Sequence, residues 1–363
     1  MQKICFFNTT KAWGGGEKWH FDVSGALQAQ GFKVLYVTSK GSEQLTRLEK
    51  SNVPYFIFRV KKFSYLNPVL IWKLKRFFEK QQIHTIIMNL SVDLKVAGIA
   101  AKWAGVERII YRRGSAIPIK NRLYNRLLFK HIVTDIIANS EATKHTILEN
   151  NSNLFDASKI QVIYNGLEFN KHQNTSEETI YKRQGEEIII GHAGRMAYQK
   201  GHEFLVDIAS ELKKTGLNFK LLLAGSGPLE NAIRQKVKLK GLEEQVIFLG
   251  FVDSISQFML NLDIFVLTSR WEGFGFVIAE AMAAKKPVVA FNISSNPELV
   301  TDNETGYLVK PFHIEEFAGK INMLAASDTL RQKFGQKAYE VVHEKFTFSK
   351  TLENVKQMLK LKN

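Results

Sequence analysis

The stretch IFVLTSRWEGFGFVIAEAMAAKKPVVA, residues 264–290, decides the fold class of this 363-residue chain. It begins with a short apolar run, passes through a loop with two glycines into a segment rich in small residues, and ends in a second apolar run. Short apolar runs that alternate with helical segments are typical of parallel strands buried on both faces of a sheet. The stretch therefore predicts a strand, a loop, a helix and a second strand in succession.

The same alternation continues in both directions along the chain, and it predicts two parallel α/β domains. In the first half we expect strands at residues 3–8, 33–38, 55–59, 85–89, 108–112, 135–139 and 161–164. In the second half we expect them at residues 187–193, 220–224, 246–249, 264–267, 287–291 and 306–309.

The chain length suits two domains of ordinary size better than one large core. Residues 164–187 are polar, contain Asn165-Gly166 and lack apolar periodicity, so we place the junction there. We expect an N-terminal domain at 1–168 and a C-terminal domain at 169–345. A final helix at about 346–363 can pack back onto the first domain.

Composition narrows the class of protein. With 45% hydrophobic and 23% charged residues the chain is globular. Cys5 is its one cysteine, which excludes an intrachain disulfide and favours a reducing compartment. The N-terminal apolar run is too short for a signal peptide, and no stretch approaches the roughly 20 apolar residues of a membrane-spanning helix. We therefore expect a cytoplasmic protein.

Charge is concentrated in the first half. Residues 1–170 carry 25 Lys and Arg against 12 Asp and Glu, whereas residues 171–363 carry 25 against 23. This asymmetry indicates an anionic surface facing the first half, either a membrane or a nucleic acid. The sequence has no zinc-ligand spacing, recognition helix or aromatic RNA motif, which argues against nucleic acid.

Two segments of the first half predict basic amphipathic helices, NPVLIWKLKRFFEKQQ at 67–82 and IPIKNRLYNRLLFKHI at 117–132. Such helices can lie on anionic lipid, or their apolar faces can belong to the core. Together with the charge they favour a protein at the inner face of the cell membrane. The apolar faces consist of Leu70, Ile71, Leu74, Phe77 and Phe78 in the first segment, and of Ile119, Leu123 and Leu127 in the second.

Three loops have the composition of phosphate-binding loops. Glycines 14–16 follow the first predicted strand and open a helix, as do Gly225 and Gly227 later in the chain. Glycine lets the backbone approach a ligand, and a helix N-terminus offers free N–H groups to an anion. Arg195 and Lys200 lie in a third loop, where they can hold a diphosphate. Each loop alone is equally compatible with a flexible turn or with solvated cations.

The opening stretch is more specific. Gly273 and Gly275 permit an unusual turn just before a helix, where free N–H groups can meet a phosphate. Glu272 precedes this turn and Glu280 follows eight residues later. Two carboxylates so placed can bind the two ends of one extended molecule.

In this order the motifs resemble the retaining glycosyltransferases of family 4 (group 1), the glycogen-synthase-like enzymes. Their GT-B architecture has two Rossmann-like parallel-sheet domains that face each other across a cleft. The motifs that carry the resemblance are Gly14-Gly15-Gly16, Gly194-Arg195 with Lys200-Gly201, Gly225-Ser226-Gly227-Pro228, Glu272-Gly273-Phe274-Gly275 through Glu280, and Asp302 with Thr305-Gly306.

The resemblance implies that the C-terminal domain binds a nucleotide-diphosphate sugar, linked to UDP or GDP, and that neither a cofactor nor a metal is required. Arg195 and Lys200 would hold the diphosphate and stabilise the leaving group, Glu272 would hold the transferred sugar, and Glu280 the ribose. The implied donor-binding residues are Gly15, Gly16, Arg195, Lys200, Gly225, Gly227, Glu272, Gly273, Phe274, Gly275, Phe276, Val277 and Glu280.

The N-terminal domain would bind the acceptor. Arg112 and Arg113 stand in the stretch where many relatives have a histidine, so they are the acceptor-side candidates. Asp93 is a candidate catalytic base, a stabiliser of positive charge at the sugar, or a helix cap.

The function implied is transfer of a sugar to a cell-surface glycan, such as lipopolysaccharide, capsule or a lipid-linked saccharide. A sugar-nucleotide epimerase or a phosphorylase on the same fold is the alternative among enzymes, and the pair Arg195 and Lys200 with the two glutamates argues against it. A dinucleotide oxidoreductase is disfavoured because Glu230 stands where a third glycine belongs. Outside enzymes, the alternative is a non-catalytic protein that binds nucleic acid or membrane.

Overall fold

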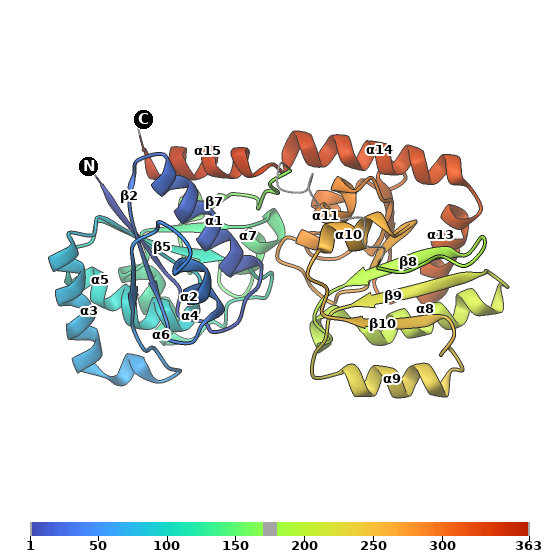
Figure 1. Cartoon of the computed structure of the whole chain (residues 1–363). Coiled ribbons are helices and arrows are strands. Elements are labelled where there is room, and N and C mark those ends of the chain that lie inside the picture. Colours follow the sequence, from blue (N-terminus) through green and yellow to red (C-terminus); the bar gives the residue numbers. More distant parts are fainter. Residues whose placement is uncertain (1, 170–179, 362–363) are drawn as a thin grey trace. The chain divides into compact units, whose positions relative to one another are not determined.

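A computed structural model describes residues 2–169 and 180–361, so part of the predicted junction, residues 170–179, lies outside the described residues (Figure 1). The chain divides into two compact units. The first contains the residues up to Asn165 together with those from Thr351 onward, and the second contains Gly166–Lys350. Each unit is an α/β unit built on its own parallel sheet, which confirms the predicted fold class.

The first unit has a seven-stranded sheet in the order β3-β2-β1-β4-β5-β6-β7. The strands are β1 (Lys3–Phe7), β2 (Lys33–Thr38), β3 (Tyr55–Ile57), β4 (Thr85–Met88), β5 (Arg108–Arg113), β6 (Asp135–Ala138) and β7 (Ile160–Val162). The helical elements are α1 (Gly15–Ala29), α2 (Glu43–Leu48), η1 (Ser64–Leu66), α3 (Pro68–Gln81), α4 (Ser91–Asp93), η2 (Leu94–Gly98), α5 (Ile99–Trp103), α6 (Leu123–His131), α7 (Glu141–Leu148) and η3 (Ala157–Lys159).

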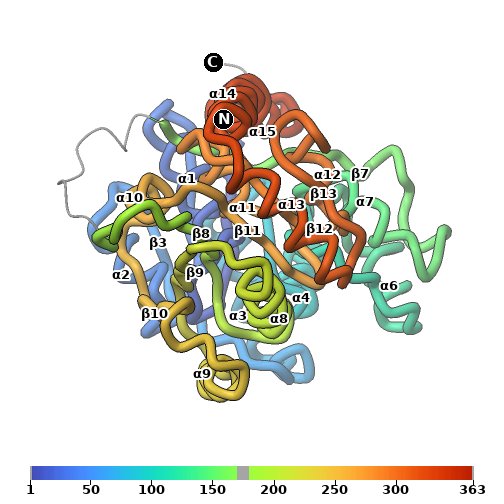
Figure 2. Tube along the Cα trace, turned by 90° about the vertical axis from the view of Figure 1, so that its right-hand side faces the viewer, coloured from blue at the N-terminus to red at the C-terminus, as the bar shows by residue number. Residues whose placement is uncertain are grey.

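The second unit has a six-stranded sheet in the order β10-β9-β8-β11-β12-β13. The strands are β8 (Ile188–Ala193), β9 (Phe219–Ala224), β10 (Val246–Gly250), β11 (Ile264–Leu267), β12 (Val288–Phe291) and β13 (Gly306–Val309). The helical elements are η5 (Tyr198–Lys200), α8 (His202–Lys214), α9 (Glu230–Leu239), α10 (Ile255–Leu260), α11 (Phe276–Ala283), α12 (Asn296–Leu299), α13 (Ile314–Ala325) and α14 (Asp328–Lys345). Helices α8 and α13 pack against each other, as do α11 and α14 (Figure 2).

All thirteen predicted strands are confirmed, with bounds shifted by two residues at most. The largest shifts are at β3 and β7. Strand β3 is the exposed edge of its sheet, and it ends at Ile57 rather than at Arg59. Strand β7 is the opposite edge, and it ends at Val162. Edge strands pair on one side only, so their ends are the least determined by pairing.

Strand order reverses between β1 and β4 in the first sheet and between β8 and β11 in the second. At such a switch point the loops that leave the carboxyl ends of the two strands diverge, and ligands of open α/β sheets bind there. The two switch points therefore mark the place in each unit where a binding site is expected.

The last helix, α15 (Phe348–Leu359), contributes its residues from Thr351 onward to the first unit. The Thr351 hydroxyl donates to the Tyr164 carbonyl at 2.8 Å, and the Arg108 guanidinium donates to the Met358 carbonyl at 2.6 Å. Leu352, Val355, Met358 and Leu359 are buried. The helix thereby completes the core of a unit whose other residues end at Asn165.

Helices α3 and α6 lie within the two predicted basic amphipathic segments. The apolar residues that these segments expose are not all those predicted from the sequence. In α3, Ile71, Leu74 and Phe78 are buried in the core, so most of the predicted lipid face of this helix packs inside the protein. Trp72 is 58% exposed instead. In the second segment, Leu123 and Leu127 of α6 are 70% and 49% exposed, whereas Ile119, which precedes the helix, is buried in the core. Among the described residues, no helix is both long and apolar enough to cross a bilayer.

Candidate functional site

The loops after β8 and β11 are hydrogen-bonded to each other at the switch point of the second unit. The Thr268 hydroxyl donates to the Gly201 carbonyl at 3.0 Å, and the Arg270 N–H donates to the Gln199 carbonyl at 2.7 Å. This pairing brings Lys200, from the loop after β8, next to Glu272, from the loop after β11.

Lys200 and Glu272 form an ion pair with an Nζ–Oε1 distance of 2.6 Å. The same carboxylate oxygen accepts a hydrogen bond from the Ser269 hydroxyl at 2.6 Å. Glu272 is only 5% exposed, and a carboxylate so buried needs a cation or hydrogen-bond donors to offset the loss of its hydration. Two residues for which the resemblance implies separate ligand groups are therefore each other's partner in the structure.

Arg195, in contrast, is exposed, and no ion pair joins it to another side chain of residues 2–169 or 180–361. It follows the end of β8 by two positions, at the same edge of the sheet as Lys200. This edge therefore offers one cation that is already paired and one that faces solvent.

Gly225 and Gly227 hold the loop after β8 in place. A Cβ atom on Gly225 would lie 2.2 Å from the Gly194 carbonyl oxygen, and one on Gly227 would lie 2.5 Å from the Met196 carbonyl oxygen. The Met196 N–H also donates to the Ser226 carbonyl at 3.0 Å. We expected these two glycines to contact the ligand. In the structure they instead allow the loop with Arg195 to pack closely on the loop after β9.

Helix α11 begins at the turn predicted from the sequence. Gly275 precedes it with a left-handed backbone (φ 86°), a conformation that favours glycine. Phe276 and Val277 form its first turn, where N–H groups have no helical partner. Gly273 and Phe274 are buried before it, and Glu280 is half-buried at its fifth position.

Two histidines that the sequence analysis did not single out lie beside Lys200. The rings of His192 and His202 meet edge to face with centroids 4.6 Å apart, and His192 Nδ1 lies 3.0 Å from the Val266 carbonyl oxygen. Burial is the main cause that lowers both pKa values, that of His202 to about 4, and the charge of Lys200 lowers them further. The pair is therefore neutral. No sequence motif marks it, because His192 is the second-last residue of β8 and His202 is the first residue of α8.

In the first unit, a buried hydrogen-bond chain crosses the switch point between β1 and β4. Arg112 donates to Asn89 at 2.9 Å and to Asn165 at 2.7 Å, and Asn89 donates to Glu17 at 3.2 Å. The Arg112 guanidinium lies 4.4 Å from the centre of the Trp19 ring. Arg112 is thus an internal group in this structure. Gly15 and Gly16, the predicted phosphate-binding glycines, form the first residues of α1 beside Glu17.

Asp93 is also buried. Its carboxylate accepts hydrogen bonds from the Thr9 N–H at 3.0 Å and from the Thr9 hydroxyl at 2.5 Å. Burial raises the pKa of Asp93 to about 7, and the bonds from Thr9 oppose that rise. The side chain ties the loop after β1 to α4 and does not cap its own helix. A catalytic role for Asp93 stays a prediction.

Arg113 lies on the opposite face of β5 from Arg112, as the alternation of a strand requires. It lines a pocket of about 460 Å³ together with residues from η1, η2, α6 and the segment before α6. Of the two predicted acceptor-side arginines, only Arg113 lines this pocket.

Two family models together match most of the chain. The model of group 1 glycosyl transferases matches residues 173–341, and that of glycosyltransferase family 4 matches residues 13–171. The boundary between the matches falls in the junction between the two units.

Among proteins of similar sequence, the capsular polysaccharide biosynthesis glycosyltransferase CapM of Staphylococcus aureus is 33% identical over 62% of this chain and 61% of its own length. A poly(ribitol-phosphate) α-N-acetylglucosaminyltransferase of S. aureus strain COL is 32% identical over 61% of this chain and 43% of its own length. The chain thus spans about half the length of these relatives. An uncharacterized glycosyltransferase of Haemophilus influenzae is 27% identical over 99% of this chain and 100% of its own length.

Solved structures confirm the fold. HepE of Anabaena, crystallised with UDP and glucose, aligns with a TM-score of 0.84 over 99% of this chain and 100% of its own, at 24% identity. The structure of TarM aligns with a TM-score of 0.79 over 99% of both chains, at 17% identity. Both alignments extend over the two parallel-sheet units of this chain.

Proposed function

Because the chain belongs to the glycosyltransferases of group 1 and family 4, we propose that it transfers a sugar from a nucleotide-diphosphate donor to a cell-surface glycan, with retention of configuration. The observation that carries the proposal is the ion pair of Lys200 and Glu272 at the β8/β11 switch point, beside the exposed Arg195 and the first turn of α11. This edge presents cations, helical N–H groups and carboxylates, which suit the phosphates and the hydroxyls of a sugar nucleotide.

Donor binding would exchange the partners of the ion pair. The diphosphate attracts Lys200 and Arg195, and sugar hydroxyls replace Lys200 as hydrogen-bond donors to Glu272. Fixed cations around the diphosphate then stabilise the negative charge that develops on the leaving group. Since these cations supply the positive charge, we propose that the reaction requires neither a metal ion nor another cofactor.

The remaining donor contacts follow from α11. The N–H groups at its start, from Phe274 through Val277, would bind the phosphates or the sugar, and Glu280 would accept hydrogen bonds from the ribose hydroxyls. HepE has been crystallised with UDP-glucose, which supports a uridine rather than a guanosine donor.

The acceptor side of the proposal rests on the first unit. CapM acts in capsular polysaccharide biosynthesis, and the S. aureus COL relative modifies poly(ribitol phosphate), so a cell-surface glycan is the acceptor class that we propose. Both relatives extend well beyond the matched region, and their acceptors are proposed here for this chain by similarity alone.

We also place the protein at the inner face of the cell membrane. Leu66 and Trp72 are exposed apolar residues of the segment 59–73. Three cations of the same segment, Arg59, Lys61 and Lys73, line a pocket of about 330 Å³. Apolar residues beside cations suit the interface of an anionic bilayer.

Nucleotide release from UDP- and GDP-sugars tests the transferase activity. We expect the wild type to release free UDP, and Lys200→Ala to slow this by about 100-fold or more, as when other electrostatic groups for leaving or developing charge are removed. The matched control is Lys236→Ala, which breaks a second 2.6 Å ion pair of the same unit, that with Asp207. An epimerase would instead leave the nucleotide attached to the sugar.

Thermal melting tests the ribose contact. A ligand that binds only the folded chain raises its melting temperature. We expect a UDP-sugar to stabilise the wild type and to lose this effect with Glu280→Ala. Equal stabilisation of the two proteins would remove the role assigned to Glu280.

A further inference from the structure

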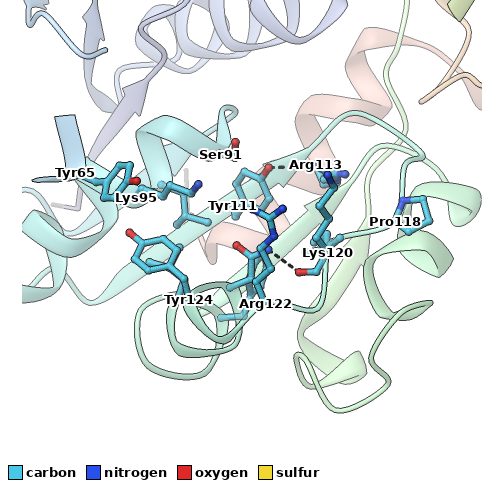
Figure 3. Close-up of a pocket in the computed structure, with 14 residues that line it drawn as sticks. Tyr65, Ser91, Lys95, Tyr111, Arg113, Pro118, Lys120, Arg122 and Tyr124 are labelled. Atoms are coloured by element: carbon cyan, nitrogen blue, oxygen red, sulfur yellow. Dashed lines mark hydrogen bonds between the residues drawn. The ribbon is translucent and has the colours of Figure 1, made fainter. Parts of the chain in front are cut away.

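The 460 Å³ pocket of the first unit is lined by cations and by no carboxylate. Its fourteen lining residues include Lys95, Arg113, Lys120 and Arg122, and none is Asp or Glu. Within residues 2–169 and 180–361, no ion pair joins any of these four cations to a carboxylate. Arg113 ends β5, and Lys120 and Arg122 lie in the segment before α6. The fold adds Lys95 from η2 to these three cations (Figure 3).

Most unpaired cations of a protein surface point into solvent. Two of the four pocket cations, Arg113 and Lys95, are instead held in position by neighbouring groups. Arg113 donates one hydrogen bond to the Ile117 carbonyl at 2.5 Å and another to the Tyr111 hydroxyl at 3.4 Å. The Lys95 ammonium lies 5.6 Å and 5.4 Å from the ring centres of Tyr65 and Tyr124. Positioned cations lose little further freedom on binding an anion, which is the property of a prepared site.

Aromatic residues complete the lining. Tyr65, Tyr111 and Tyr124 line the pocket (Figure 3). The Tyr124 hydroxyl is buried and has no hydrogen-bond partner in the described part of the chain. Burial raises the pKa of Tyr124, so this hydroxyl keeps its proton and can donate it to a ligand oxygen. Ring faces with polar tips suit a sugar, which is apolar on its C–H faces and polar at its rim.

Building on the function proposed above, we propose that this pocket binds the acceptor through a phosphate ester, with the adjoining sugar packed on the tyrosines. Four cations exceed what one carboxylate can neutralise, whereas a phosphate monoester carries a charge of about −2 and a diphosphate a similar or larger one. Arg113 and Arg122 offer guanidinium groups that match phosphate oxygens in pairs. The volume lies in the usual range for a small-molecule site.

The phosphate has two possible sources, a phosphate-bearing glycan or the head group of a lipid-linked saccharide. The segment that lines the pocket also carries exposed apolar residues on its outer side, namely Ile117, Leu123 and Leu127. A lipid tail attached to a phosphate in the pocket would find apolar surface there. The experiment therefore includes both sources.

Binding measurements with two matched ligand pairs test the proposal. The soluble pair is N-acetylglucosamine 1-phosphate and N-acetylglucosamine; the lipid pair is phosphatidylcholine vesicles with and without a polyprenyl diphosphate. We expect the full chain to bind the phosphate-bearing member of at least one pair about tenfold more tightly or better, since charge-assisted hydrogen bonds add to affinity. The pair that shows the preference identifies the source.

The double variant Lys120→Ala/Arg122→Ala should remove this preference, because both exposed side chains line the pocket. The matched control Arg126→Ala/Lys130→Ala removes two exposed cations of α6 outside the pocket and should retain the preference. Unchanged melting curves verify that both double variants fold. Equal binding of the two members of both pairs, or equal loss in the two double variants, overturns the proposal.

Nucleotide release by the wild type separates this proposal from the transferase activity. Release of UDP without phosphate-dependent binding would overturn the pocket proposal alone. Phosphate-dependent binding without release from any nucleotide sugar would overturn the proposed donor chemistry and leave the anion site standing.

Discussion

At the scale of single residues, the two glycines after β9 determine how closely the loop that carries Arg195 can pack. The backbone of Gly225 has φ +119°, and a Cβ atom there would lie 2.2 Å from the Gly194 carbonyl oxygen, so a side chain is excluded by conformation and by space. The loop that carries Arg195 can approach the sheet edge only because Gly225 and Gly227 lack a Cβ atom.

Gly225→Ala should therefore lower the free energy of unfolding by more than the strain of a positive φ alone, because the new methyl group would also clash with the Gly194 carbonyl. We expect a loss of roughly 3 kcal/mol or more in the free energy of unfolding, and weaker UDP-sugar binding. Gly216→Ala is the control, since Gly216 also has a positive φ (+76°) but open space around it, and it should cost about 1–2 kcal/mol. Urea unfolding measures both. Equal losses would mean that the contact with Gly194 relaxes freely.

His202 makes stability depend on pH in a defined window. Its folded-state pKa is about 4, below the ordinary value of 6.5, because of burial and then the charge of Lys200. Between these values the unfolded chain binds a proton that the folded chain does not bind. The stabilising contribution of neutral His202 is thus full above pH 6.5 and is lost as the pH falls towards 4.

His202→Gln removes this proton uptake. From pH 6.5 to 4, the free energy of unfolding of the wild type should fall more steeply than that of the variant, by about 1.4 kcal/mol per pH unit. Asp93, whose raised pKa acts in the opposite direction, is common to both proteins and cancels in the comparison. Parallel curves would contradict the assignment.

At the scale of elements, the proposed membrane contact rests on exposed apolar residues of η1 and α3. Leu66 and Trp72 are 69% and 58% exposed, whereas Ile71 and Leu74 pack inside. Leu66→Ser/Trp72→Ser should lower partition into anionic vesicles by about tenfold or more, since the loss of a buried apolar side chain is worth that much. Co-sedimentation at low and high salt measures it.

The control for this change is Leu239→Ser, which removes a side chain 87% exposed on α9 of the second unit. It should leave vesicle binding unchanged. Equal loss in both variants would show that general surface hydrophobicity, and not the basic unit, drives binding.

The positions of the elements followed from the sequence, but the direction of individual side chains did not. Apolar runs located all thirteen strands, because buried parallel strands are continuous in hydrophobicity. Sequence pattern did not separate Arg112 from Arg113, since their opposite environments depend on what packs on each face of β5. It also did not reveal the pocket cations, the histidine pair, or the partnership of Lys200 and Glu272, because each depends on how separate strands, helices and loops meet in the fold.

At the scale of the whole molecule, the first unit is discontinuous in sequence. A chain that ends after Lys350 lacks Leu352, Val355, Met358 and Leu359, all of them buried. At roughly 1.5–3 kcal/mol for each side chain, the loss is comparable to the stability of a typical domain.

We therefore expect this truncation to unfold the first unit and to spare the second. Hydrogen exchange should show lost protection in β5 and β6 and unchanged protection in β8 and β11. A chain that ends after Leu359 is the control and should keep both. Uniform protection in the shorter chain would show that the part of α15 from Thr351 onward contributes little to the core.

This discontinuity also bears on synthesis at the ribosome. Residues 166–350, which form the second unit, are synthesised before the part of α15 that belongs to the first unit. The second unit can therefore fold before the first unit is complete. Translation arrested anywhere in that interval would yield a nascent product whose early part is unfinished and open to proteases. The first unit can therefore complete its core only after α15 has been synthesised.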